Sequence, residues 1–218
     1  MEDVLDMEQH EESHFERSVE DVVQNGYEFD FSDFFNFGKE ILFTQTWTFI
    51  GFAALFFAVS IVVAYIPFGG VLISPLGAGV YIAANRIATG RSLEMKDFFN
   101  GFKLFLPLLL ANLVSGLLTG LGLVFLIIPG IYLAVSWSLT IPLVLFKRME
   151  FWDAMEASRQ IVGKNWWSFF GMFLILFLLN LGGLLLLGVG LLVTIPLSSC
   201  VLYAAYHKIV GAGPVEFI

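Results

Sequence analysis

The sequence predicts an all-α, polytopic membrane protein with six transmembrane helices in three repeated hairpins, each preceded by an amphipathic interfacial helix. Three observations predict this fold class. A motif of the form Asp-x-x-Asn/Glu-x-x-Lys/Arg recurs at residues 33–39, 97–103 and 153–159. Each copy leads into an apolar stretch that reaches an Ile-Pro step, at residues 66–67, 128–129 and 195–196, and a second apolar stretch follows. Hydrophobic residues make up 58% of the chain, well above the roughly 45–50% of a soluble domain.

The apolar stretches have the length that a bilayer requires, since a core about 30 Å thick needs roughly 20 residues of helix. We expect spans at residues 45–66, 71–88, 104–128, 130–147, 167–190 and 191–209. Backbone amides in lipid must be paired within their own segment, so the spans should be helices. Pro and Gly at 67–70, 129–130 and 188–190 predict the turns, although Pro196 could instead kink the sixth span.

The expected organisation has three parts. An acidic arm covers residues 1–28, and a short tail covers 212–218. Between them, residues 29–211 form the six-helix bundle, with repeats at about 33–90, 97–148 and 153–211. All Lys and Arg residues fall on the side of the spans opposite the proline turns. By the positive-inside rule, that side and both termini should face the cytoplasm.

The net charge of −8 originates at the N-terminus, because residues 1–32 hold eleven acids against Arg17 alone, a balance of −10, and the rest of the chain carries +2. The arm lacks the basic start and apolar centre of a signal peptide. Phe15, Val19, Val22 and Val23 follow helical spacing, which predicts a short helix that docks on a partner protein or on the body of the chain. The simpler alternative is a solvated tail.

The recurring motifs lie on predicted interfacial helices. In the second copy one face carries the phenylalanines Phe98, Phe99, Phe102 and Phe105, and the other carries Lys96, Asp97, Asn100 and Lys103. Such helices lie in the membrane interface, and Trp47, Trp152, Trp166 and Trp167 extend this layer as an aromatic belt. Anchoring is the simplest role. A pocket for anionic lipid headgroups is the alternative, and its candidate contacts are Lys39, Lys103 and Arg159.

Residues that would carry chemistry are scarce. The expected spans contain no Asp or Glu, which argues against a proton-coupled pump. No catalytic or phosphate-binding motif is present, Cys200 has no partner cysteine, and His10 and His14 lack a third spaced ligand. We therefore expect no enzyme activity, no cofactor, no metal site and no nucleic-acid partner.

Small and polar residues are the remaining signals within the spans. Gly116 with Gly120, and Gly79 with Ala83, form small faces for close helix packing, within the bundle or in a homo-oligomer. The polar residues Asn112, Ser115, Thr119 and Asn180 should hydrogen-bond between helices. The two asparagines are also the best candidates for lining a polar cavity.

Residues 126–138 read Leu-Ile-Ile-Pro-Gly-Ile-Tyr-Leu-Ala-Val-Ser-Trp-Ser, and residues 154–159 and 163–166 read Ala-Met-Glu-Ala-Ser-Arg and Gly-Lys-Asn-Trp. These motifs resemble the bacterial integral-membrane family of the glycerophosphodiester phosphodiesterase membrane domain and its uncharacterised relatives. The resemblance implies a multi-pass helix bundle in the bacterial cytoplasmic (inner) membrane. Some members fuse the bundle to a soluble phosphodiesterase domain, which has no counterpart here, so no catalytic residue is transferred.

Two classes of function stay open. The first is a non-enzymatic scaffold or accessory subunit that binds a partner protein, membrane lipid or both. The alternative is a carrier of lipid or another weakly polar molecule, through a cavity near Asn112 and Asn180. A polar cavity that opens to one side favours the carrier, and a sealed apolar bundle favours the scaffold.

Overall fold

The structure is a computed structural model that describes residues 17–65, 73–186 and 188–213. Its regular elements in these ranges are helices, with no strand. They are α2 (Val19–Asn25), α3 (Phe31–Thr44), α4 (Thr46–Ala64), α5 (Ile73–Ala88), the 3-10 helix η2 (Met95–Leu104), α6 (Phe105–Phe125), α7 (Ile127–Ser136), α8 (Thr140–Phe146), α9 (Phe151–Lys164), α10 (Trp166–Leu185) and α11 (Leu191–Ile209).

Four helical stretches of the described chain are long and apolar enough to cross a membrane: α4, η2 with α6, α7 with α8, and α10. The all-helical class predicted from sequence is therefore confirmed. The other two expected spans correspond to α5 and α11. The described part of α5 has 16 residues, and α11 contains Pro196 and carries His207 and Lys208 in its last turn.

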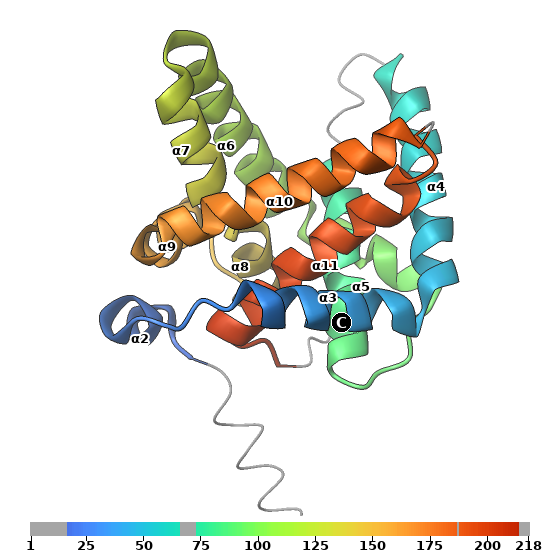
Figure 1. The fold of residues 1–218 in the computed structure, drawn as a ribbon, viewed down its shortest axis with the longest axis horizontal. Coiled ribbons are helices and arrows are strands. Elements are labelled where there is room, and N and C mark those ends of the chain that lie inside the picture. The colour runs from blue at the N-terminus through green and yellow to red at the C-terminus, as the bar shows by residue number, and fades with distance from the viewer. Residues whose placement is uncertain (1–16, 66–72, 187, 214–218) are drawn as a thin grey trace, which may run out of the picture.

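The hairpin turns differ in part from the expectation. Leu126, with extended dihedral angles, separates α6 from α7, so Pro129 lies in the first turn of α7 and not in the hairpin turn. Proline is tolerated there because the amides of a first helical turn have no partner within the helix. The last turn ends before Leu191 and leaves Pro196 inside α11. Both turns lie on the upper side of Figure 1, as does the far end of α4. The first expected turn lies outside the described residues.

The expected fourth span, 130–147, is broken where α7 ends at Ser136 and α8 begins at Thr140. Pro142 explains the break, because a proline ring clashes with the carbonyl four residues earlier, here that of Ser138. Ser158 of α9 compensates: its hydroxyl donates to the Ser136 carbonyl at 2.7 Å and accepts from the Leu139 amide at 3.0 Å. These backbone groups at the break are therefore hydrogen-bonded within the protein, as an apolar environment requires.

The three helices that carry the recurring motif are not equivalent. α3 and α9 are α-helices of 14 residues, whereas η2 is a 3-10 helix of 10 residues. Each passes into the next helix through one non-helical residue: Gln45 (φ −140°, ψ 54°), Leu104 (φ −112°, ψ 34°) and Asn165 (φ −133°, ψ 41°).

These three helices, which we call the entry helices, each pack on a helix that returns from a hairpin. α3 packs on α11, η2 on α5 and α9 on α8. Two of the contacts bring main chains together. A Cβ atom on Gly79 of α5 would overlap the Phe98 carbonyl oxygen, and one on Gly38 of α3 would lie 2.7 Å from the Val201 nitrogen. The predicted small face of α5 therefore packs on η2, and Ala83 beside it is fully buried.

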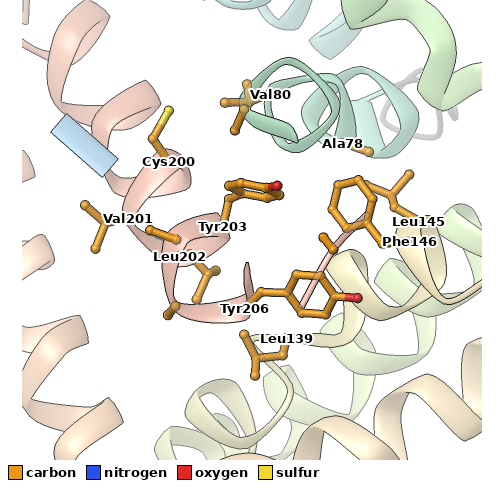
Figure 2. Close-up of a cluster of buried hydrophobic side chains, with 14 of the residues drawn as sticks. Ala78, Val80, Leu139, Leu145, Phe146, Cys200, Val201, Leu202, Tyr203 and Tyr206 are labelled. Carbon is orange, nitrogen blue, oxygen red and sulfur yellow. The ribbon is translucent and has the colours of Figure 1, made fainter. Parts of the chain in front are cut away.

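The core is centred on α11 (Figure 2), where Cys200, Tyr203 and Tyr206 are fully buried. The Phe146 ring meets both tyrosine rings, at centroid distances of 5.6 and 5.5 Å. Asn85 of α5 donates to the Tyr203 hydroxyl at 3.0 Å. The last turn of α11 is therefore fixed by α5 and α8 as well as by α3.

The predicted packing face at Gly116 and Gly120 meets no neighbour among the described residues, because a Cβ atom on either glycine would lie within 4 Å of none of their atoms. α6 and α7 instead approach through Gly122 and Gly130, whose main chains are in direct contact. Small residues favour close packing without identifying which turn of the helix meets a neighbour, and packing of this face in a homo-oligomer stays a prediction.

We expect Gly79→Ala to lower the free energy of unfolding by about 1–3 kcal/mol, because the new methyl group overlaps the main chain of Phe98. Gly116→Ala is the matched control and should be neutral or slightly stabilising, since alanine favours helix and the site is open. Denaturant unfolding in mixed micelles measures both. Equal effects of the two substitutions would contradict the packing described.

Candidate functional site

Asn112 and Asn180, the two amides that the sequence marks as cavity residues, each line a hollow. The hollow at Asn112 has a volume of about 390 Å³ and the one at Asn180 about 290 Å³. Tyr81 and Ser199 line both hollows. The other residues of the first are Phe56, Ile73, Ser74, Gly77, Ala78 and Ile141, and those of the second are Phe173, Leu176, Phe177, Ser198 and Leu202.

Asn112 joins α6 to α5. Its Nδ2 atom donates to Ser74 Oγ at 2.6 Å and to the Leu108 carbonyl of its own helix at 3.1 Å. Ser74 Oγ in turn donates to the same carbonyl at 2.8 Å. The amide thus makes the interhelical hydrogen bond predicted for it while the residue stays exposed at the hollow.

Asn180 joins α10 to α11 in the same manner. Its Nδ2 atom donates to the Leu176 carbonyl and to Ser198 Oγ, both at 2.8 Å. Its Oδ1 atom is buried and has no hydrogen-bond partner in the described chain. A buried acceptor without a partner costs about 1–3 kcal/mol, so this oxygen is an unfavourable feature of the α10–α11 contact.

The other two predicted polar residues do not bridge helices. Ser115 donates to the Ala111 carbonyl within α6, and Thr119 makes no hydrogen bond to another described helix. Sequence reasoning missed Tyr81 and the serines that pair with the asparagines. The available signal was Ser74 beside Pro75 and Ser198 close to Pro196, because polar residues next to prolines in apolar helices mark places where helix bonds are incomplete.

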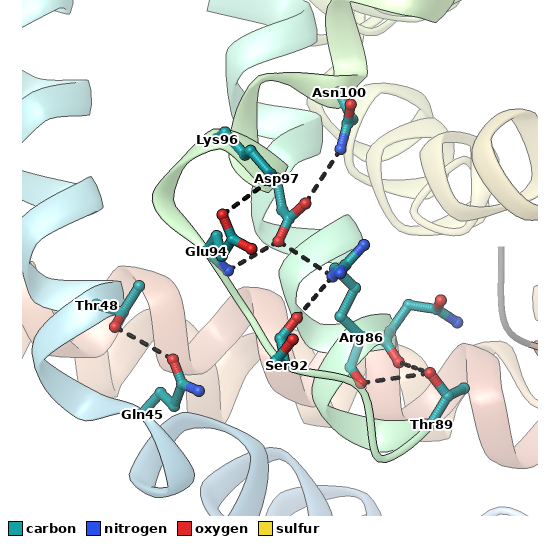
Figure 3. A network of polar contacts seen from close by, with 10 residues as sticks. Gln45, Thr48, Arg86, Thr89, Ser92, Glu94, Lys96, Asp97 and Asn100 are labelled. Carbon is teal, nitrogen blue, oxygen red and sulfur yellow. Dashed lines mark hydrogen bonds and ion pairs between the residues drawn. The ribbon is translucent and has the colours of Figure 1, made fainter. Parts of the chain in front are cut away.

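A buried ion pair joins η2 to the end of α5 (Figure 3). Asp97 Oδ2 lies 3.1 Å from Arg86 Nε and accepts from the Glu94 amide at 2.8 Å, while Arg86 Nε also donates to the Ser92 carbonyl. Asp97 is only 2% exposed. The expectation that it belongs to the polar outer face of an interfacial helix is therefore wrong, because the close contact between η2 and α5 turns it inward.

The three bases considered for lipid headgroups lie on three different entry helices. Lys39 of α3 lies over the Phe35 ring at 5.6 Å, and Lys103 of η2 is exposed. Arg159 of α9 pairs with Glu156, and this pairing lowers the pKa of the Glu156 carboxyl to about 2. Each entry helix packs mainly on a different returning helix, and a headgroup pocket at these bases stays a prediction.

The apolar stripe of the N-terminal arm contacts the body of the chain. In α2, Val22 is fully buried, Val19 and Val23 are half-buried, and the helix packs on α9. The Tyr27 hydroxyl donates to the Ile161 carbonyl at 2.9 Å and so extends this contact. The stripe predicts docking on a partner protein or on the body of the chain, and its described residues contact the body. Phe15 lies outside the described residues.

Among the described residues, no three His, Cys, Asp or Glu side chains gather as a metal site; His10 and His14 fall outside them. Comparison of the chain with protein-family models, curated proteins and solved structures gave no match. The candidate site is therefore defined by its own geometry, as a mostly apolar pair of hollows with a few oriented amides and hydroxyls.

The contact of Tyr27 predicts a pH dependence. Burial raises the pKa of Tyr27 above its ordinary value of 10.0. An acid whose pKa is raised by folding stabilises the folded state below its unfolded pKa, and that stability is lost as the pH rises through the folded pKa. We expect the docking of residues 17–29 to weaken only well above pH 10. A spectrophotometric pH titration measures tyrosine ionisation, and subtracting the titration of Tyr27→Phe isolates the signal of Tyr27. Tyr65→Phe is the control. Ionisation of Tyr27 at or below pH 10 would contradict the contact.

Proposed function

We propose that this protein is an integral membrane protein that binds a lipid-like molecule in the two hollows between α5, α6, α10 and α11, and carries or presents it within the bilayer. The observation that carries the proposal is the position of Asn112 and Asn180. Both amides come from apolar helices, and both line hollows that have Tyr81 and Ser199 as common lining residues.

The chemistry of the walls supports this proposal. Small-molecule sites are typically concave, about 300–1,000 Å³ in volume, and mostly apolar with a few oriented polar groups. Amides within apolar helices are costly unless they bond to a neighbour or a ligand. Here each amide uses its Nδ2 atom to hold two helices together.

The membrane setting that we propose has six crossings, with both termini on the cytoplasmic side of a bacterial inner membrane. The exposed surface supports it: Trp47 is 84% and Trp167 78% exposed, each near the start of a long apolar helix. The tip of the α6–α7 hairpin also exposes Phe125 and Ile128, which is unfavourable in water and favourable in lipid.

We also propose that the three hairpins are copies of one unit. The similar dihedral angles at Gln45, Leu104 and Asn165 support this. The copies at Asp33 and Asp153 are in the same register, since Gln45 accepts from the amides of Thr48 and Phe49, and Asn165 from those of the corresponding Ser168 and Phe169. The shorter η2 makes the second copy the divergent one.

The lipid-binding role is better supported than docking of a partner protein through the arm, because the Val22 stripe is occupied by α9. The family resemblance of residues 126–138 and 154–166 remains a prediction. It is consistent with a helix bundle in the cytoplasmic membrane and contributes no catalytic residue.

Cysteine labelling tests the proposed topology. In a Cys200→Ser background, Leu126→Cys and Val189→Cys, both at hairpin tips and at least 65% exposed, should react with an impermeant thiol reagent added to intact cells. Ser92→Cys and Glu150→Cys should react only after permeabilisation, because positively charged segments stay inside. Labelling of the second pair in intact cells would contradict the orientation.

Lipid occupancy tests the proposed function. We expect lipid to co-purify with the protein from mild detergent and to be seen by native mass spectrometry. The double variant Asn112→Leu with Asn180→Leu should reduce the occupancy at least about fivefold, since it fills the hollows and removes their polar groups. Ser115→Ala, which alters a hydroxyl on α6 that lines neither hollow, is the matched control. Unchanged occupancy in the double variant would refute the proposed site.

A further inference from the structure

We infer that α10 is a lid on the hollow at Asn180, and that residues 17–29 are the latch that holds this lid closed. The inference rests on the proposed function and concerns how a ligand enters and leaves that site. Three features of the described residues carry it: the wall that α10 forms, the unequal fixation of its two ends, and the short segment that holds one of these ends.

α10 forms one wall of the hollow at Asn180, and α11 forms the wall that faces it. The α10 wall consists of Phe173, Leu176, Phe177 and Asn180, and the α11 wall of Ser198, Ser199 and Leu202. α10 packs on α11 (Figure 1), and its residues Leu174, Leu178 and Leu181 are exposed. A displacement of α10 is therefore opposed mainly by its contact with α11 and by the contacts at its two ends.

The tip of α10, where the chain turns towards α11, is fixed closely to α11. The main chains meet there, since a Cβ atom on Gly190 would lie 2.7 Å from the Gly183 Cα atom. Asn180 Nδ2 also donates to Ser198 Oγ at 2.8 Å. Nearer the start of α10 the packing is open, because a Cβ atom on Gly171 would meet nothing within 4 Å. Hinges lie at the ends of elements, so the tip is the point about which α10 can turn.

The base of α10, where the helix begins, is held by contacts between side chains. The Trp166 ring stacks on Tyr132 of α7 at a centroid distance of 5.7 Å, and its Nε1 atom donates to the Tyr132 carbonyl at 3.4 Å. The buried Phe169 ring meets the Phe29 ring edge-on at 5.0 Å. Phe169 lies about one helical turn before Phe173, so the contact with Phe29 positions the wall of the hollow.

The latch joins the base of α10 to the end of α11. At one end, the Arg17 amide donates to the carbonyl of Val210, which follows α11, at 2.8 Å. At the other end, the latch is bonded where α9 meets α10. Asn165 Nδ2 donates to the Tyr27 carbonyl at 3.3 Å, and the Tyr27 hydroxyl donates to the Ile161 carbonyl at 2.9 Å. The latch therefore links both walls of the hollow at the ends that lie away from the tip.

The latch is also the part of this region that opens most readily. Its helix α2 has 7 residues, and Val22 is the one buried residue in it. A helix of this length is not stable by itself, and segments with few buried apolar contacts open locally before the rest of a fold. Opening of the latch leaves α10 held at its tip. The base then moves away from α11, and the hollow admits or releases a lipid chain.

The first measurement is hydrogen–deuterium exchange of the full-length protein in phosphatidylcholine nanodiscs. Val22→Asp places a charge in the buried contact with α9 and should release the latch. Gln24→Asp places the same charge on an exposed position of the same helix and is the matched control. We expect faster amide exchange in residues 168–176 of Val22→Asp, with unchanged protection at the tip in residues 180–185 and 191–198. Gln24→Asp should behave as the wild type.

The second measurement is the exchange of bound phosphatidylcholine for its deuterated form, followed by native mass spectrometry. Bound lipid is the fraction that is lost in the double variant Asn112→Leu with Asn180→Leu. We expect Val22→Asp to exchange this lipid about tenfold faster than the wild type, and Tyr27→Phe about fivefold faster because it loses one hydrogen bond. Gln24→Asp should exchange its lipid at the wild-type rate.

The outcomes separate the latch from the proposed function. Equal amide exchange at the base of α10 in Val22→Asp and Gln24→Asp, or equal rates of lipid exchange, would overturn the inference. If Val22→Asp loses protection throughout the chain, Tyr27→Phe decides, because it removes only a hydroxyl group; wild-type protection of residues 168–176 in that variant would overturn the latch. If the wild-type protein holds no bound lipid, the proposed function fails. Faster amide exchange confined to the base of α10 would then still support the latch.

Discussion

The close approach of main chains between entry helices and returning helices is the constraint on which the rest of this structure depends. η2 packs on α5 where Phe98 meets Gly79 and Gly101 meets Pro75, and α3 packs on α11 where Gly38 meets Val201. Where the surroundings are apolar on all sides, burial of apolar surface gives little drive to bring helices together, so van der Waals contact at such short separations must supply it. A single β-carbon at these glycines removes that contact.

The same packing determines which charges are buried. Asp97 and Asp33 hold equivalent places in the recurring motif, and each pairs with a base on the returning helix beneath it, Arg86 and Lys208 respectively. The tighter η2–α5 contact buries Asp97, whereas Asp33 stays half-exposed. Removing one partner of a buried pair typically costs about 3–5 kcal/mol, and of an exposed pair about 0–1 kcal/mol. The two ion pairs are equivalent in sequence, but the buried one contributes more to the stability of the fold.

The sequence was sufficient for the helical class and for the approximate helix positions, because long apolar runs allow little else. It was not sufficient for helix contacts. In a helix of a soluble protein, an apolar face indicates burial against protein. In a membrane helix, an apolar or small face can contact either protein or lipid. The open surroundings of Gly116 and Gly120 illustrate this. Asn112 and Asn180 were identifiable because amides are rare in apolar helices. Their partners Ser74, Ser198 and Tyr81 were not, since the register between helices separates them in sequence.

α5 connects the packing constraint to the candidate site, because its two sides serve different purposes. Pro75 and Gly79, four residues apart, face the main chain of η2, while Ser74, Gly77 and Tyr81 recur at i, i+3 and i+7 and line the hollow. These two stripes are adjacent on one helix, so a displacement of α5 away from η2 moves Ser74 and Tyr81 as well. The position of Tyr81 in the hollows is therefore set by glycine contacts on the other stripe of α5, and the shape of the hollow is a consequence of how closely η2 can approach.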